Sequence, residues 1–86
     1  MEQNIKSYID KLSINDINKF SNKYDVKLNN DELNIIYRYI KNDWKTIIYG
    51  NYNSILSDLK NKIDLNKYKK IEKLFYQFKS KYQNLL

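Results

Sequence analysis

The stretch IDLNKYKKIEKLFYQFKSKYQNLL, residues Ile63–Leu86, indicates the class of fold that this sequence adopts. Its apolar residues recur at alternating intervals of three and four positions, at Tyr68, Ile71, Phe75, Phe78, Tyr82 and Leu85. In an α-helix this spacing places all of those side chains on one face. The sequence therefore predicts a long C-terminal helix within a compact all-α bundle of four to five short helices, which this helix crosses.

The opposite face of the same predicted helix is polar and basic. It carries Lys69, Lys73, Tyr76 and Ser80, with Lys70 and Lys79 at its margins. Lysine ammonium groups can bind phosphates, and an exposed tyrosine ring can stack on a base. The same pattern is also typical of an ordinary solvated helix face. The sequence leaves both interpretations open.

Shorter helices are predicted upstream, because apolar residues again recur at helical spacing. The predicted segments are Glu2–Leu12, Ser13 to about Tyr24, a helix that follows Asn29, and Ser54–Ile63. The expected inward residues include Tyr8 in the first segment and Ile14 in the second. The helix that follows Asn29 is apolar on two sides, which favours a central position in the bundle.

The chain has no Pro and a single Gly, so few residues mark helix boundaries by breaking a helix. The helix starts must therefore be identified from capping residues. Ser13 stands three residues before Asp16, and Asn29 stands three residues before Glu32. This is the spacing of a capping box, in which side chain and backbone bond reciprocally across the first turn. Asp64 is expected to cap the C-terminal helix in a similar way.

Residues Asn42–Tyr52 are the least regular part of the pattern. Turn-forming residues and a short β-prone run occur together here, so the sequence predicts an extended connector whose apolar residues plug the core. Trp44, the only tryptophan, lies in this connector. Its ring either packs on the edge of the core or is an exposed anchor for a partner, because Trp is enriched at binding hot spots.

Composition excludes several classes of function. The 86 residues have the length of one small domain, expected to span residues 1–86. There is no His and no Cys, so the commonest general base and all thiolate chemistry are missing. Most carboxylates stand at predicted helix starts, where capping explains them. We therefore expect no enzymatic activity and no metal, cofactor or small-molecule ligand.

The net charge of +6 and the pI of about 9.4 have two interpretations. The charge suits an anionic partner such as RNA, DNA or a membrane surface. It also fits the Lys-, Asn- and Ile-rich composition that an AT-rich genome produces. The sequence has no apolar run long enough to span a membrane and no signal-peptide pattern. We therefore expect no transmembrane segment and a cytoplasmic location.

Three stretches resemble a small uncharacterised all-helical family, a domain of unknown function from low-GC Gram-positive bacteria. They are LSINDINKFSNKYDVKLNNDELNIIYRYIK (Leu12–Lys41), IIYGNYNSILSDLKNKI (Ile47–Ile63) and KIEKLFYQF (Lys70–Phe78). The matching positions are mostly core and capping residues. The resemblance therefore implies the helical fold and no activity, substrate or cofactor.

These observations together predict a small non-enzymatic binding or accessory protein that acts through a protein partner. The alternative is a nucleic-acid- or ribosome-associated protein that uses the basic face of the C-terminal helix. The candidate contact residues for either partner are Lys69, Lys73, Tyr76, Ser80 and Trp44.

Overall fold

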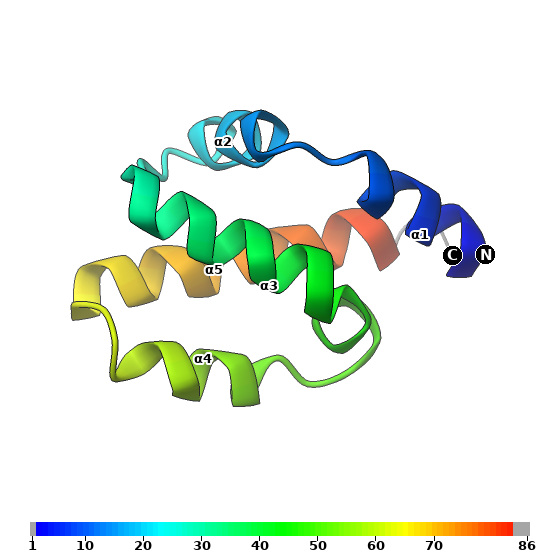
Figure 1. Ribbon diagram of the computed structural model, residues 1–86. Coiled ribbons are helices and arrows are strands. Elements are labelled where there is room, and N and C mark those ends of the chain that lie inside the picture. Colours follow the sequence, from blue (N-terminus) through cyan, green and yellow to red (C-terminus); the bar gives the residue numbers. More distant parts are fainter. Residues whose placement is uncertain (1, 84–86) are drawn as a thin grey trace.

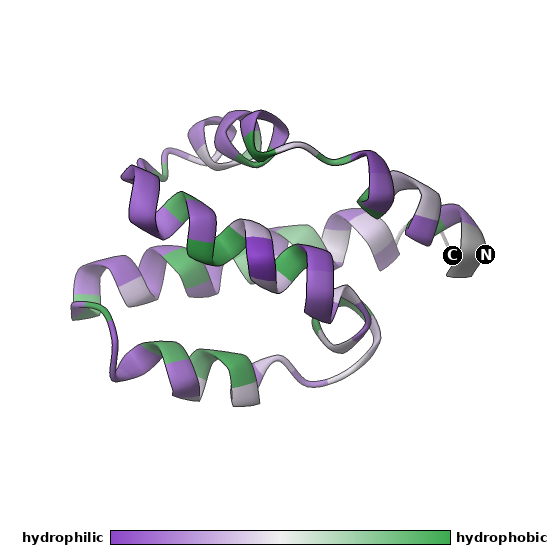
Figure 2. Cartoon of the chain, viewed as in Figure 1, coloured by the Kyte–Doolittle hydropathy of each residue, from purple (hydrophilic) through white to green (hydrophobic). Residues whose placement is uncertain are grey.

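The computed structural model describes residues 2–83 and confirms the all-α class (Figure 1). The described residues contain no strand and form five helices, α1 (Glu2–Lys11), α2 (Ile14–Lys23), α3 (Asn30–Tyr49), α4 (Asn53–Lys60) and α5 (Leu65–Gln83). α3 packs against α1, α2 and α5, and α5 also packs against α4. Hydrophobic and hydrophilic residues alternate along the ribbons of α3, α4 and α5 (Figure 2), as amphipathic helices require.

The inward face predicted for the C-terminal helix is confirmed. Ile71, Phe75, Phe78 and Tyr82 are all buried, and Tyr68 is partly buried against them. Leu74 is also buried, so the apolar stripe is wider than the three-and-four spacing indicated. Leu85 lies outside the described residues. The buried face of α5 therefore supplies a large share of the core.

The prediction of an extended connector over Asn42–Tyr52 is wrong for most of its length. α3 continues as a helix to Tyr49, and Gly50 ends it. Ile47 and Ile48 are fully buried, so helical burial of these side chains outweighs the local preference for turn and strand. A break in the helix persists at Asp43, where φ is −121° and ψ is 22°. The ribbon of α3 changes direction close to its end (Figure 1).

Both predicted capping boxes are present. The Asp16 amide donates to the Ser13 side chain at 3.1 Å, and the Ser13 amide donates to Asp16 at 2.9 Å. The Glu32 amide likewise donates to Asn29 at 2.9 Å, and the Asn29 amide donates to Glu32 at 2.8 Å. The Glu32 side chain is nearly buried and forms an ion pair of 3.1 Å with Lys67. The start of α3 is thereby tied to α5.

We expect Asn29→Ala to lower the free energy of unfolding by about 1 kcal/mol, because the Glu32 amide loses its side-chain acceptor. Urea denaturation followed by circular dichroism measures this loss. The control is Asn29→Asp, which keeps a capping oxygen and should stay close to wild type. Equal stability of the alanine variant and wild type would contradict the capping role.

The end of α2 is a Schellman motif. The Val26 amide donates to the Ser21 carbonyl at 2.8 Å, and the Asp25 amide donates to the Asn22 carbonyl at 3.1 Å. Asp25 adopts a left-handed conformation, with φ of 59°, in the position where glycine is most common. Val26 is buried as a result, so the connector after α2 contributes to the core.

Two residues that were expected to point inward are exposed. The exposed fraction is 54% for Tyr8 and 37% for Ile14. The Tyr8 ring lies at the edge of the core, with its centroid 6.3 Å from that of Tyr82. Ile14 is the first residue of α2, before the helix has turned its apolar face inward. Neither of these predictions of burial is correct.

None of the helices between residues 2 and 83 combines the length and the apolar character needed to cross a membrane.

Candidate functional site

The predicted basic face of α5 is exposed but mixed in charge. Lys69, Lys73 and Tyr76 are exposed, Tyr76 by 59%, while Ser80 is partly buried. Glu72 is also exposed, and its spacing of three from Lys69 and four from Tyr76 places it beside both. This face therefore presents a carboxylate among its ammonium groups.

Three lysines donate hydrogen bonds to the carbonyl ends of other helices. Lys41 of α3 reaches the Ile9 carbonyl of α1 at 2.7 Å. From α5, Lys73 lies 3.4 Å from the carbonyl oxygen of Tyr24, the residue that ends α2, and Lys79 lies 3.0 Å from that of Gly50. The last carbonyls of a helix lack partners within the helix and carry partial negative charge. Part of the positive charge of this protein therefore stabilises the fold.

Trp44 belongs to the core, because only 7% of the residue is exposed. Its ring centroid lies 6.3 Å from that of Tyr49. This burial agrees with the interpretation of a ring packed against the core and not with an exposed anchor. The backbone is helical on both sides of the break at Asp43, in place of the expected loop.

A groove is lined by residues of α2 and α5. Its volume is about 300 Å³, and its lining residues are Leu12, Asp16, Ile17, Lys19, Phe20, Lys23, Phe78, Lys81 and Tyr82. This size suits one or two side chains of a partner.

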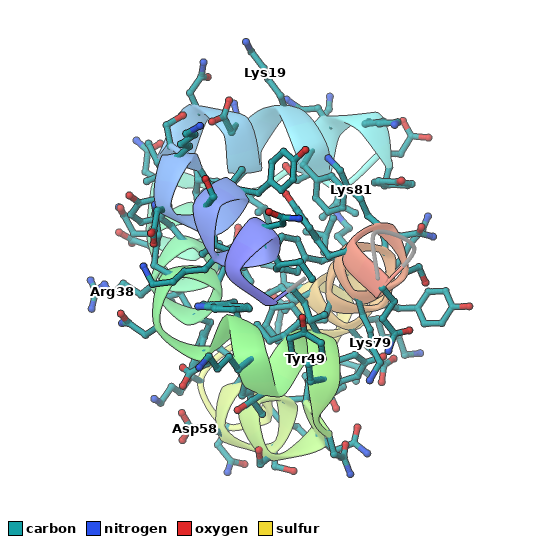
Figure 3. All side chains as sticks on the ribbon, turned by 90° about the vertical axis from the view of Figure 1, so that its right-hand side faces the viewer. Lys19, Arg38, Tyr49, Asp58, Lys79 and Lys81 are labelled. Atoms are coloured by element: carbon teal, nitrogen blue, oxygen red, sulfur yellow. The ribbon has the colours of Figure 1, made fainter. Side chains whose placement is uncertain are left out.

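The floor of the groove is aromatic and its rim is basic. The Phe20 and Phe78 rings meet edge to face, with centroids 6.2 Å apart. The Lys81 ammonium lies over Phe20 and Tyr82, at 5.6 and 5.5 Å from the ring centroids, within the range of cation–π attraction. Lys19 extends from α2 into solvent, and Lys81 lies between α2 and α5 (Figure 3).

One carboxylate lies among the lysines of the groove. Hydrogen bonds from Ser13, with a smaller contribution from Lys19, hold the pKa of the Asp16 carboxyl below its usual value. Burial raises the pKa of the Tyr82 hydroxyl above its usual value. The groove therefore combines the cations Lys19, Lys23 and Lys81 with one anion and an apolar floor.

The sequence does not predict this groove, because its residues come from two helices that are far apart along the chain. Lys19 and Lys23 are one turn apart and flank Phe20, which is a local signal of a basic helix edge. Both α2 and α5 pack against α3, and this arrangement brings Lys81 and Phe78 close to these residues. Within residues 2–83, no three acidic side chains converge in a way that could hold a metal ion.

Comparison with known protein families, with curated proteins and with solved structures gives no match. The resemblance to an uncharacterised bacterial family therefore stays a prediction, and the function is inferred from the surface of the molecule itself.

Proposed function

We propose that this chain is a small non-enzymatic binding protein of the cytoplasm, and that a segment of a protein partner docks in the groove between α2 and α5. The observation that carries the proposal is the pairing of an aromatic floor with a charged rim, formed by Lys19, Lys23 and Lys81. Interfaces commonly combine an apolar centre, which supplies affinity, with a polar rim, which orients the partner.

The groove favours a protein segment over a nucleic acid. Stacking a base requires an accessible ring face. Phe78 and Tyr82 are only 2% and 4% exposed, and the Lys81 ammonium lies over Phe20. An apolar side chain of a protein segment can pack against ring edges and needs no exposed ring face.

The second candidate is nucleic-acid or ribosome contact through the outer face of α5. The exposed ring of Tyr76, together with the ammonium groups of Lys69 and Lys73, favours it. The Glu72 carboxylate on the same face and the use of Lys73 at the end of α2 both weaken it. We therefore rank it below the groove.

Site-directed photo-crosslinking in the native cell tests the proposal. A photoreactive amino acid replaces Lys19 or Lys81 at the groove, Tyr76 on the outer face of α5, or the exposed Lys60 of α4 as the control. We expect the same protein to be crosslinked from Lys19 and Lys81 and not from Lys60. The crosslinked product should persist after nuclease treatment.

The positions that give crosslinks distinguish the two candidate functions. Crosslinks to nucleic acid from Tyr76, with none from the groove positions, would support the second candidate and contradict the first. Products of equal yield at all positions would show unspecific contact and would also contradict docking in the groove.

A further inference from the structure

We infer that the segment docking between α2 and α5 is acidic, with carboxylates that meet Lys19, Lys23 and Lys81 and with one large apolar side chain seated between the helices. This inference rests on the proposed function and adds the chemistry of the partner. It follows from the arrangement of charge around the groove and from the volume of the groove.

The two lysines on the α2 side are arranged to meet successive acidic groups. Lys19 and Lys23 are four residues apart, so they are neighbours on one side of the helix, with Cβ atoms about 5–6 Å apart. Both residues are exposed. The Lys23 ammonium lies 5.7 Å from the centroid of the Tyr24 ring, a contact that leaves its hydrogen-bond donors accessible.

Lys81 faces this pair from the α5 side. Its ammonium contacts the faces of Phe20 and Tyr82, and within residues 2–83 it forms no ion pair with a carboxylate. An ammonium over a ring keeps protons directed away from the ring. A carboxylate of a partner could therefore bind Lys81 from the solvent side while the contact with the rings persists.

Several other lysines already have polar partners within the fold. Lys6, Lys62 and Lys67 pair with carboxylates, and Lys41, Lys73 and Lys79 donate to carbonyls. The cations of the groove instead lie beside aromatic rings or in solvent. They outnumber the single carboxylate of Asp16 by three to one, so the groove has a net positive charge. Charge complementarity therefore favours an acidic partner.

The aromatic floor of the groove provides the surface on which an apolar side chain of the partner packs. The groove above the touching rings of Phe20 and Phe78 has a volume of about 300 Å³, which admits a large side chain such as Phe or Leu. Burial of that side chain would supply affinity that a purely electrostatic contact lacks. The expected motif is therefore a run of Glu or Asp residues around one large apolar residue.

A defined peptide tests this chemistry. The probe is a fluorescein-labelled Glu-rich peptide with one central Phe, and binding is measured by fluorescence anisotropy at low and at physiological salt. The proteins are wild type, Lys19→Glu/Lys23→Glu, and the matched control Lys60→Glu/Lys70→Glu, which makes the same change in net charge away from the groove. Thermal unfolding of each variant verifies the fold.

We expect the groove variant to bind the peptide about ten-fold more weakly than wild type, because attractive ion pairs become repulsive. The control variant should lose about two-fold or less at physiological salt, where screening limits distant charges. Binding should weaken as salt rises. A peptide with Ser in place of Phe, and one with Lys in place of Glu, should both bind less well than the probe.

Several results would overturn the inference. Equal weakening by both double variants would show attraction by net charge alone, and equal binding of the Phe and Ser peptides would show that no apolar side chain is seated. Tighter binding of single-stranded RNA, lost in the groove variant, would assign the groove to nucleic acid. Absence of peptide binding with crosslinks at Lys19 and Lys81 intact would reject the acidic chemistry and leave the proposed function standing.

Discussion

Replacing Phe75 with Ala should lower the free energy of unfolding by about 3–5 kcal/mol, because the change removes a fully buried ring and leaves a cavity. Phe75 lies midway along α5, and its ring centroid is 5.9 Å from that of Tyr52. Domains of this kind have total stabilities of about 5–15 kcal/mol, so the variant should be close to unfolding at physiological temperature. Urea denaturation at two temperatures measures the loss.

The neighbouring residue supplies a matched control for this prediction. Tyr76 is also aromatic and also in α5, but 59% of it is exposed. Tyr76→Ala should change stability by about 0.5 kcal/mol or less. If the two variants lost similar stability, the assignment of the buried and exposed faces of α5 would be incorrect.

Replacing Trp44 with Ala should have an effect of similar size, about 3–5 kcal/mol, because the indole lies in the core at the break in α3. Trp44→Phe retains much of the ring and should lose considerably less. The single tryptophan also reports on its own surroundings. Its fluorescence in the wild type should be shifted to the blue and should move to the red on unfolding.

Tyr49 is the control for Trp44, because it contacts the indole from the same end of α3 while 42% of it is exposed. Tyr49→Ala should cost less than half as much as Trp44→Ala. A tryptophan emission typical of water in the folded protein, or a loss below about 1 kcal/mol, would place Trp44 at the surface and contradict its burial.

The parts of the fold that the sequence predicted are those governed by local physics. The capping boxes at Ser13 and Asn29 are completed by residues three positions on, so the spacing alone identifies them. The burial of Phe75 and Phe78 follows from helical periodicity. Each of these features requires no knowledge of a neighbouring helix.

The errors occur where contacts between helices decide the structure. Asn42 and Asp43 favour a turn, yet burial of Ile47 and Ile48 against other helices extends α3 past them. Contacts between helices also form the groove, which is why the sequence does not predict it. Periodicity could find Lys69, Lys73 and Tyr76 on one helix, but the groove needs α2 and α5 to be adjacent.

The lysines that cap other helices affect how the chain assembles during synthesis. α5 is translated after the other described helices, yet it supplies Lys73 to the end of α2 and Lys79 to the end of α3. At about 5–20 residues per second, the 19 residues of α5 take about one to four seconds to make. During that interval the nascent α2 and α3 lack these donors, and the apolar face of α3 lacks the helix that covers it. The ribosome-bound chain should therefore expose an apolar surface that chaperones can bind. This surface is covered once α5 has been synthesised and packs against α3.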